Sequence, residues 1–173
     1  MEGKTNENIV ISSIGYLLAE YEKDLKFINN YRRYRNDEID EIDEKDYLKN
    51  NPEYFRLFID SYRVTRNVKT HCVSDLLREL KEWPDDKCRD VDDFANKLRE
   101  EGIIHANKLM VSLSSKLLFL RFPGKIIPID TLNRKALGLL KNEYSEFSEV
   151  IEGFICNNQN DIDYYLCSIE KYP

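Results

Sequence analysis

The spacing of the apolar residues is the feature that most limits the folds open to this chain. Through most of the sequence, apolar side chains recur at intervals of three and four residues, which is the period of an amphipathic helix. Residues that interrupt helices are scarce, since the 173 residues include 6 glycines and 5 prolines. We therefore predict an all-α protein, a compact bundle of about seven to nine helices.

The same pattern gives the expected elements. A first long helix covers 9–35, and its buried stripe is made by Ile9, Ile14, Leu17, Leu18, Tyr21, Leu25 and Ile28. The acidic segment 36–50 is either a short surface helix or a mobile connection. The other expected helices cover 50–67, 73–83, 90–102, 103–122, 131–142, 143–156 and 161–172.

The chain is long enough to bury a core, because 42% of its 173 residues are hydrophobic. It shows no internal repeat, low-complexity tract or clean linker. We expect one all-helical domain over 1–173, or two small lobes that share a cleft.

Cysteine usage and the N-terminus narrow the class of protein. Cys72, Cys88, Cys156 and Cys167 lie far apart, without a C-x-x-C motif or a partnering pair of histidines. We expect reduced, mostly buried thiols, and neither a metal site nor another cofactor. The polar N-terminus, and the lack of roughly 20 consecutive apolar residues, favour a cytoplasmic protein without a membrane partner.

Lys116 interrupts a run of leucines in the stretch SSKLLFLRF. If 109–121 form one helix, Leu109, Leu113, Lys116 and Leu120 share a face, so an ammonium group replaces an apolar side chain there. Burial disfavours the charged form and lowers a lysine pKa, which makes the amine nucleophilic. In the alternative interpretation, the methylenes cover apolar surface and the charge reaches water.

Asp130 follows the apolar piece 126–129, which we expect to be extended after a turn at 122–125. An aspartate before a helix commonly caps it, and either Asp130 or Thr131 would cap the next helix. A carboxylate can also stabilise positive charge that develops on a reacting group.

Basic residues surround these two positions, and acids are almost absent there. Between 104 and 142, Asp130 is the one acidic residue. The formal net charge of −6 argues against uniform binding of polyanions, so a nucleic-acid role depends on such a local patch. The expected phosphate contacts are Arg121, Lys125, Arg134 and Lys135, with help from Arg32, Arg33 and Arg35 if the fold brings them near.

Over about 90–141, the chain has a fixed order of features: Lys116 in an apolar helix, then an extended piece that ends in Pro-Ile-Asp-Thr. This order resembles the core of the helix-hairpin-helix DNA glycosylase superfamily, in particular its small, divergent bacterial 8-oxoguanine-glycosylase-like members. The resemblance implies that Lys116 forms a Schiff base with the deoxyribose and that Asp130 stabilises charge at the sugar. It also implies a helix-hairpin-helix glycosylase-like fold.

The sequence departs from that pattern in three places. The hairpin glycines are missing from LMVSLSS, where the hydroxyls of Ser112, Ser114 and Ser115 could bind a DNA phosphate instead. The histidine common after Asp-Thr is Leu132 here, and the four-cysteine iron–sulfur loop of some relatives has no counterpart.

Two functions therefore stay open. The first is a DNA-binding glycosylase and lyase that removes an altered base, with Trp83, Phe119, Phe122 and the tyrosines as candidates to face the extruded base. The second is a non-catalytic module of a bacterial repair or defence system that retains the fold. Its partner would be nucleic acid or a protein, and the acidic residues 37–46 would be a contact surface.

Overall fold

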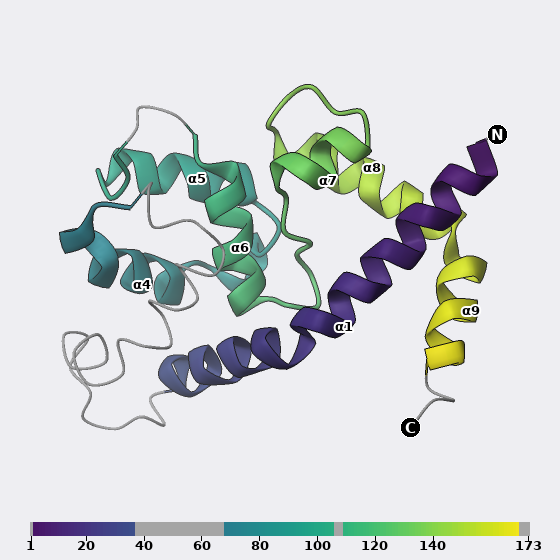
Figure 1. The fold of residues 1–173 in the computed structure, drawn as a ribbon. Coiled ribbons are helices and arrows are strands. Elements are labelled where there is room, and N and C mark those ends of the chain that lie inside the picture. The colour runs from purple at the N-terminus through teal and green to yellow at the C-terminus, as the bar shows by residue number, and fades with distance from the viewer. Residues whose placement is uncertain (1, 37–67, 106–108, 170–173) are drawn as a thin grey trace. The chain divides into compact units, whose positions relative to one another are not determined.

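The computed structural model describes residues 2–36, 68–105 and 109–169, which form helices joined by loops (Figure 1). Within these ranges there are α-helices and two short 3-10 helices, and the sole β pairing is an isolated bridge between Val68 and Ile104. The prediction of an all-α protein is confirmed. The expected helix at 50–67 and the acidic residues 37–46 lie outside the described residues.

The bounds of the α-helices agree with most of the predicted positions. They are α1 (Glu2–Arg35), α4 (Val73–Glu82), α5 (Val91–Glu100), α6 (Val111–Arg121), α7 (Thr131–Ala136), α8 (Tyr144–Asn157) and α9 (Gln159–Ile169). The 3-10 helices are η2 (Thr70–Cys72) and η3 (Asp85–Lys87). No described helix is long and apolar enough to cross a bilayer.

Two helices are shorter than expected. α6 begins at Val111 rather than near residue 103, because Ile103 and Ile104 leave the helical path; Ile104 makes the bridge to Val68. α7 ends at Ala136, and two residues later Gly138 has a φ of 73°, a left-handed conformation that commonly terminates helices.

The chain divides into two units. One contains Met1–Lys26 and Ser148–Pro173, and the other contains Phe27–Phe147. The second unit holds α4, α5, α6 and α7, and therefore both candidate catalytic residues.

The core of the second unit lies where α6 packs on α5 and also meets α4. Leu80, Phe94, Leu98 and Leu117 are fully buried there, and each buried side chain of this size stabilises the fold by roughly 1.5–3 kcal/mol. The Trp83 ring lies 4.9 Å from the Phe94 ring, centroid to centroid. This core gives α6 a fixed position.

The buried stripe predicted for α1 is only partly right. Ile14 and Ile28 are buried, but Leu18, Tyr21 and Leu25 are 53%, 55% and 38% exposed. The side chains of Ile9 and Leu17 are outside the described set. A single buried stripe does not run along the whole of α1, because the residues of α1 up to Lys26 belong to one unit and those from Phe27 belong to the other.

The last turns of α1 instead bury a set of residues that the prediction mostly missed. These are Phe27, Ile28, Tyr31 and Tyr34. Their spacing still has the helical period, so the prediction of a helix is right here, but the buried face is rotated about the helix axis from the predicted one.

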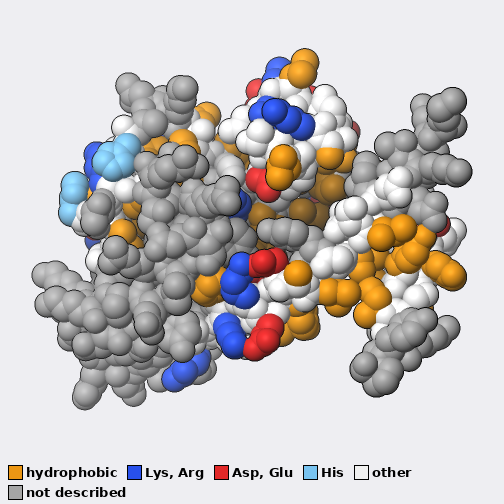
Figure 2. All heavy atoms as spheres, viewed as in Figure 1, with side chains coloured by type: hydrophobic (Ala, Val, Ile, Leu, Met, Phe, Trp, Pro, Cys, Tyr) orange, Lys and Arg blue, Asp and Glu red, His pale blue; other side chains and the backbone are white. Residues whose placement is uncertain are grey.

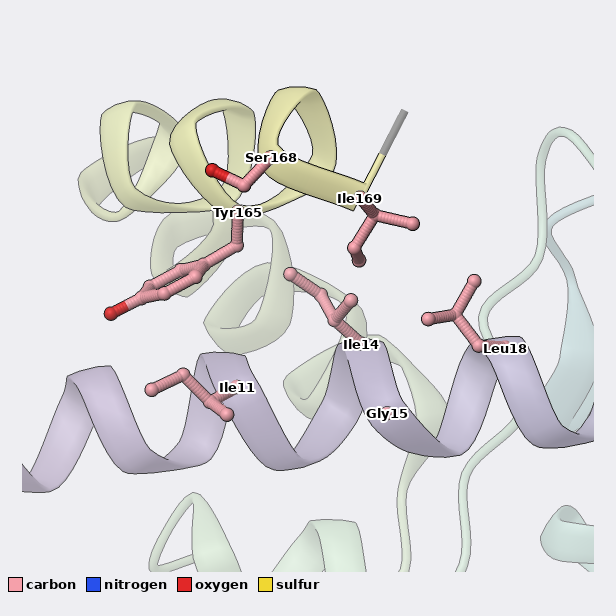
Figure 3. Close-up of a pocket in the computed structure, with 7 residues that line it drawn as sticks. All are labelled: Ile11, Ile14, Gly15, Leu18, Tyr165, Ser168 and Ile169. Atoms are coloured by element: carbon pink, nitrogen blue, oxygen red, sulfur yellow. The ribbon is translucent and has the colours of Figure 1, made fainter. Parts of the chain in front are cut away.

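In the first unit, α1 and α9 leave a hollow of about 270 Å³ between them. Its lining is formed by Ile11, Ile14, Gly15, Leu18, Tyr165, Ser168 and Ile169. Side chains from the two helices face each other across this space (Figure 3).

Candidate active site

Lys116 lies on a narrow, half-exposed edge of a helix that is otherwise buried. α6 has 11 residues, and the three that are not buried are Ser112, Lys116 and Phe119. Steps of four and three residues place these three on one face of the helix. The amine therefore leaves α6 beside one serine and one aromatic ring.

The expected apolar face around Lys116 is only partly present. Leu113 and Leu120 are buried, but Leu109 precedes the helix and is 38% exposed. Lys116 thus borders the core rather than replacing a residue at its centre.

Asp130 is the N-cap of α7, as the sequence suggested. Its Oδ1 accepts hydrogen bonds from the backbone N–H groups of Leu132 at 2.7 Å and Asn133 at 2.8 Å. The Asn133 side chain accepts in return from the Asp130 backbone N–H at 2.7 Å, which completes a capping box. Both cap bonds use the same carboxylate oxygen, and together they fix the orientation of the side chain.

The extended piece before Asp130 is held by side chains of neighbouring helices. The Tyr144 hydroxyl accepts from the Ile127 N–H and donates to the Ile127 carbonyl, each at 3.1 Å. The Asn133 amide donates to the Pro128 carbonyl at 2.8 Å. The Ile129 N–H donates to the Ser115 hydroxyl at 3.1 Å. Because its polar groups have partners, this segment can be extended without belonging to a sheet.

The electrostatic environment connects the two candidate catalytic residues. Burial lowers the pKa of the Lys116 ammonium below its ordinary value, and the Asp130 carboxylate opposes this by favouring the charged form. Burial is the larger of the two effects, so the net direction is downward. The carboxylate thus favours the charged amine from the start of α7, and a catalytic role of the pair stays a prediction.

The three serines have different surroundings. Ser112 is half-buried on the edge that carries Lys116. Ser114 and Ser115 are 0% exposed, so their hydroxyls do not reach the surface where a phosphate would bind. Ser115 also already accepts from Ile129 and donates to the Ser112 carbonyl.

The predicted phosphate contacts on the turn and on α7 are accessible. Lys125 and Lys135 are exposed. Arg134 is half-exposed and donates from Nη1 to the Leu140 carbonyl at 2.5 Å. Basic side chains lie beside acidic ones on the described surface in Figure 2. A nucleic-acid interface at Lys125, Arg134 and Lys135 would therefore be a local basic patch on a surface of mixed charge.

Arg121 is not at the surface. Its side chain is 4% exposed, and it donates to the carbonyls of Leu80 and Lys81 at the end of α4. Its Nη2 also lies 2.8 Å from a carboxylate oxygen of Asp85. Arg121 therefore donates hydrogen bonds to the last carbonyls of α4, and we exclude it from the proposed nucleic-acid contacts.

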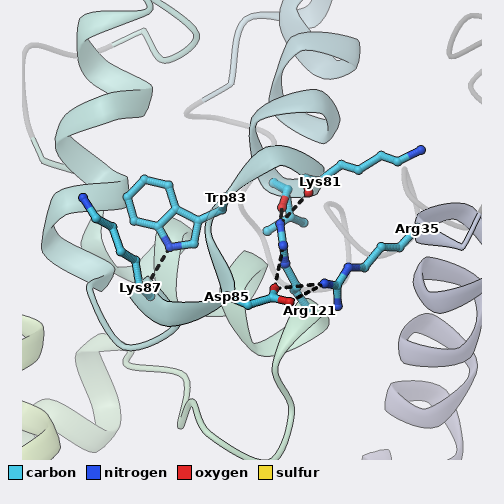
Figure 4. A network of polar contacts seen from close by, with 7 residues as sticks. Arg35, Lys81, Trp83, Asp85, Lys87 and Arg121 are labelled. Carbon is cyan, nitrogen blue, oxygen red and sulfur yellow. Dashed lines mark hydrogen bonds and ion pairs between the residues drawn. The ribbon is translucent and has the colours of Figure 1, made fainter.

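Asp85 joins Arg121 to the last turn of α1. Its carboxylate accepts from Arg35 at 2.8 and 2.9 Å as well as from Arg121, so it lies between two guanidinium groups (Figure 4). Arg121, and secondarily Arg35, hold the pKa of the Asp85 carboxyl below its usual range. Arg32 and Arg33 remain exposed.

Sequence reasoning missed this Arg35–Asp85–Arg121 network. An arginine directly after the apolar run LLFL was a signal that it has buried partners. Its partners lie 36 to 41 residues earlier in the chain, and no spacing in the sequence identifies them.

The candidates Trp83, Phe119 and Phe122 also differ in burial. Trp83 is buried and donates from its indole nitrogen to the Lys87 carbonyl at 2.8 Å, and Phe122 is buried as well. Phe119 is half-exposed on the same edge as Lys116. Of these three, Phe119 is the one placed to meet a ligand at the amine.

The cysteines are all free, but the prediction that most are buried holds only for Cys72 and Cys88. Cys156 and Cys167 are exposed on α8 and α9. Within the part of the chain that the structure describes, no group of three or more histidine, cysteine or acidic side chains could hold a metal ion.

We compared the chain with family models, with curated proteins and with solved structures. None of the three comparisons gave a match. The functional argument therefore depends on the residues of this chain alone.

Proposed function

We propose that the protein binds DNA and acts on it as a base-excision glycosylase and lyase, with a fold that resembles the helix-hairpin-helix superfamily. Lys116 is the nucleophile and Asp130 is its electrostatic partner. The observation that supports this most is the half-buried Lys116 amine, whose pKa burial lowers, within the field of a carboxylate fixed at the next helix.

The chemistry needs the neutral amine. In that form, the Lys116 nitrogen can attack C1′ of the deoxyribose, and the bond between C1′ and the base breaks. The departing base takes the electron pair and the proton that the amine gives up. Opening of the sugar ring then leaves an imine, the Schiff base, between Lys116 and the sugar.

The carboxylate of Asp130 would stabilise positive charge on the sugar as the base departs. Its capping box keeps the group in one orientation, so no reorganisation is needed as charge develops. Phe119, on the same edge as Lys116, is the candidate to stack on an extruded base.

Phosphate binding falls to the accessible residues of the predicted set. These are Ser112, Lys125, Arg134 and Lys135. Ser114, Ser115 and Arg121 are withdrawn into the protein and are excluded.

Borohydride trapping tests the proposal, because borohydride reduces a Schiff base to a stable amine. The native protein is incubated with duplexes that carry abasic sites or a panel of oxidised, alkylated and deaminated bases. We expect a covalent protein–DNA adduct with the native protein and none with Lys116→Ala. Lys141→Ala, which removes an exposed lysine outside the proposed phosphate contacts, should retain the adduct. Absence of adduct and of strand cleavage across the panel would refute the enzymatic proposal.

A second function, a non-catalytic nucleic-acid-binding or protein-binding module of a bacterial repair or defence system, is favoured by one specific observation. Several residues expected to contact DNA instead make hydrogen bonds inside the protein: Arg121 bonds to the end of α4, and Ser115 bonds to the extended piece. Salt-dependent DNA binding without any trapped adduct would support this function over the first. No DNA binding even at low salt would favour a protein partner.

A further inference from the structure

We propose that Ser115 is the positioning residue of this site: its buried hydroxyl fastens the extended piece 126–129 to α6 and so sets Asp130 beside Lys116. The inference rests on the proposed function for its catalytic meaning, but the geometry that it explains does not depend on DNA chemistry.

The hydroxyl of Ser115 uses both its donor and its acceptor capacity. It accepts from the Ile129 N–H at 3.1 Å and donates to the Ser112 carbonyl at 3.1 Å. Ser115 and Ile129 are both 0% exposed, so water does not compete for these bonds. The donor bond within α6 orients the oxygen lone pairs toward the extended piece.

The two residues that this hydrogen bond joins are the neighbours of the candidate catalytic pair. Ser115 directly precedes Lys116, and Ile129 directly precedes Asp130. A single hydrogen bond therefore joins the side chain one residue before Lys116 to the backbone N–H one residue before Asp130. The bonds of Tyr144 and Asn133 connect the same piece to α8 and α7, whereas the Ser115 bond connects it to the helix that carries the amine.

Ser114 offers a matched control. It is also 0% exposed and lies on the same helix, but its hydroxyl finds no hydrogen-bond partner among the described residues. Ser114→Ala and Ser115→Ala thus make the same chemical change in equally buried positions, and they differ in the loss of the Ile129 bond.

The test measures the pKa of Lys116 in each variant, from the pH dependence of its reaction with an amine-specific reagent followed by mass spectrometry. In Ser115→Ala the Asp130 carboxylate is no longer held near the amine, so its effect weakens and the pKa of Lys116 falls below the native value. Ser114→Ala should leave it unchanged. An identical pKa in the two variants would overturn the inference.

A double-mutant cycle separates positioning from a general effect on the fold. If Ser115 acts through Asp130, Ser115→Ala should have no effect on the Lys116 pKa in an Asp130→Asn background. An undiminished effect in that background would contradict the inference. Ser115→Cys, which keeps the shape of the side chain with a slightly larger atom and a weaker hydrogen bond, gives the same test if Ser115→Ala does not fold.

The same variants report on the proposed function independently. We expect the trapped adduct of Ser115→Ala to form roughly 10- to 100-fold more slowly, because misplaced catalytic groups lose rate steeply. A shifted Lys116 pKa with no adduct in any variant, native included, would retain the positioning role and refute the glycosylase. A normal adduct rate and a native pKa in Ser115→Ala would refute the positioning role and retain the glycosylase.

Discussion

At the scale of single residues, Asp130 combines two properties that substitution can separate. Its Oδ1 caps α7, and its negative charge acts on Lys116. Asparagine is as good an N-cap as aspartate but carries no charge. We expect Asp130→Ala to lower the free energy of unfolding by about 1 kcal/mol and Asp130→Asn to leave it close to the native value.

Urea unfolding of the two Asp130 variants measures this difference, and both variants should lose the trapped adduct. Equal destabilisation by alanine and asparagine would mean that the cap contributes little. A normal adduct with Asp130→Asn would remove the carboxylate from the mechanism.

Lys116 makes stability depend on pH in a direction that its burial fixes. Because burial lowers its pKa below the ordinary value of 10.5, the unfolded chain binds this proton more tightly than the folded one. Stability should therefore rise with pH between the lowered pKa and 10.5, and the cost of the buried charge is fully present below that window.

Replacement of Lys116 by methionine removes this cost. We expect the gain in unfolding free energy of Lys116→Met over native to be largest at pH 7 and to shrink as the pH approaches 10.5. Urea unfolding of both proteins at several pH values checks this, and the other titrating groups cancel in the difference. A gain that stays constant or grows with pH would contradict the burial of Lys116.

The sequence was sufficient to predict that Lys116 lies on a helix and that Asp130 or Thr131 caps the next one, because a short turn and an extended piece separate the two helices. It was not sufficient to separate Ser112 from Ser114 and Ser115. All three lie in one stretch of α6, and which of them are covered depends on how α5, α4 and the 126–129 piece pack around that helix.

At the scale of elements, Arg121 terminates α4 from a distance. It donates to the carbonyls of Leu80 and Lys81, which the ended helix leaves without partners, and it pairs with Asp85. We expect Arg121→Ala to destabilise the protein by roughly 1–3 kcal/mol, because buried carbonyls lose their donors.

Arg35→Ala is the matched control for Arg121, since it removes the other guanidinium of Asp85 from a more exposed position. An exposed ion pair contributes at most about 1 kcal/mol, so thermal or urea unfolding should show the smaller loss for Arg35→Ala. A larger loss of stability for Arg35→Ala than for Arg121→Ala would show that the network stabilises the protein mainly through its contact with α1 and not through α4.

Helical periodicity predicted the described helices well, since the residues of α4 and α5 alternate between one buried and one exposed face. It predicted α6 less well, because a helix buried on nearly all sides has no polar face to mark its start. In α1 it identified the helix but not the face, because the partners change along its length.

At the scale of the whole molecule, a net charge of −6 requires that DNA binding depend on a few cations. We expect DNA affinity to fall steeply with salt, and Lys125→Ala and Lys135→Ala each to reduce the slope of log affinity against log salt by roughly 1. Lys141→Ala is the control, because Lys141 lies 3.8 Å from Glu143 and is outside the proposed contacts. Equal slopes for all three variants would show that these lysines do not meet phosphates.

The composition and periodicity of the chain predicted the all-α class, because those patterns report burial along each helix. They left one domain and two lobes both open, because the division of contacts into two units depends on tertiary packing between the first half of α1 and the C-terminal helices. The pattern of residues 9–35 predicts one continuous helix, and a continuous helix gives no sign that its two ends belong to different units.

The most direct test of the central claim is the identity of the residue that carries the trapped sugar. After borohydride reduction, protease digestion and mass spectrometry of the adduct would locate the modified lysine among the candidates of the acid-poor stretch. We predict that the mass of the reduced sugar is found on the peptide that contains Lys116, at Lys116 itself. Modification of Lys125, Lys135 or another exposed lysine, with Lys116 unmodified, would contradict the account.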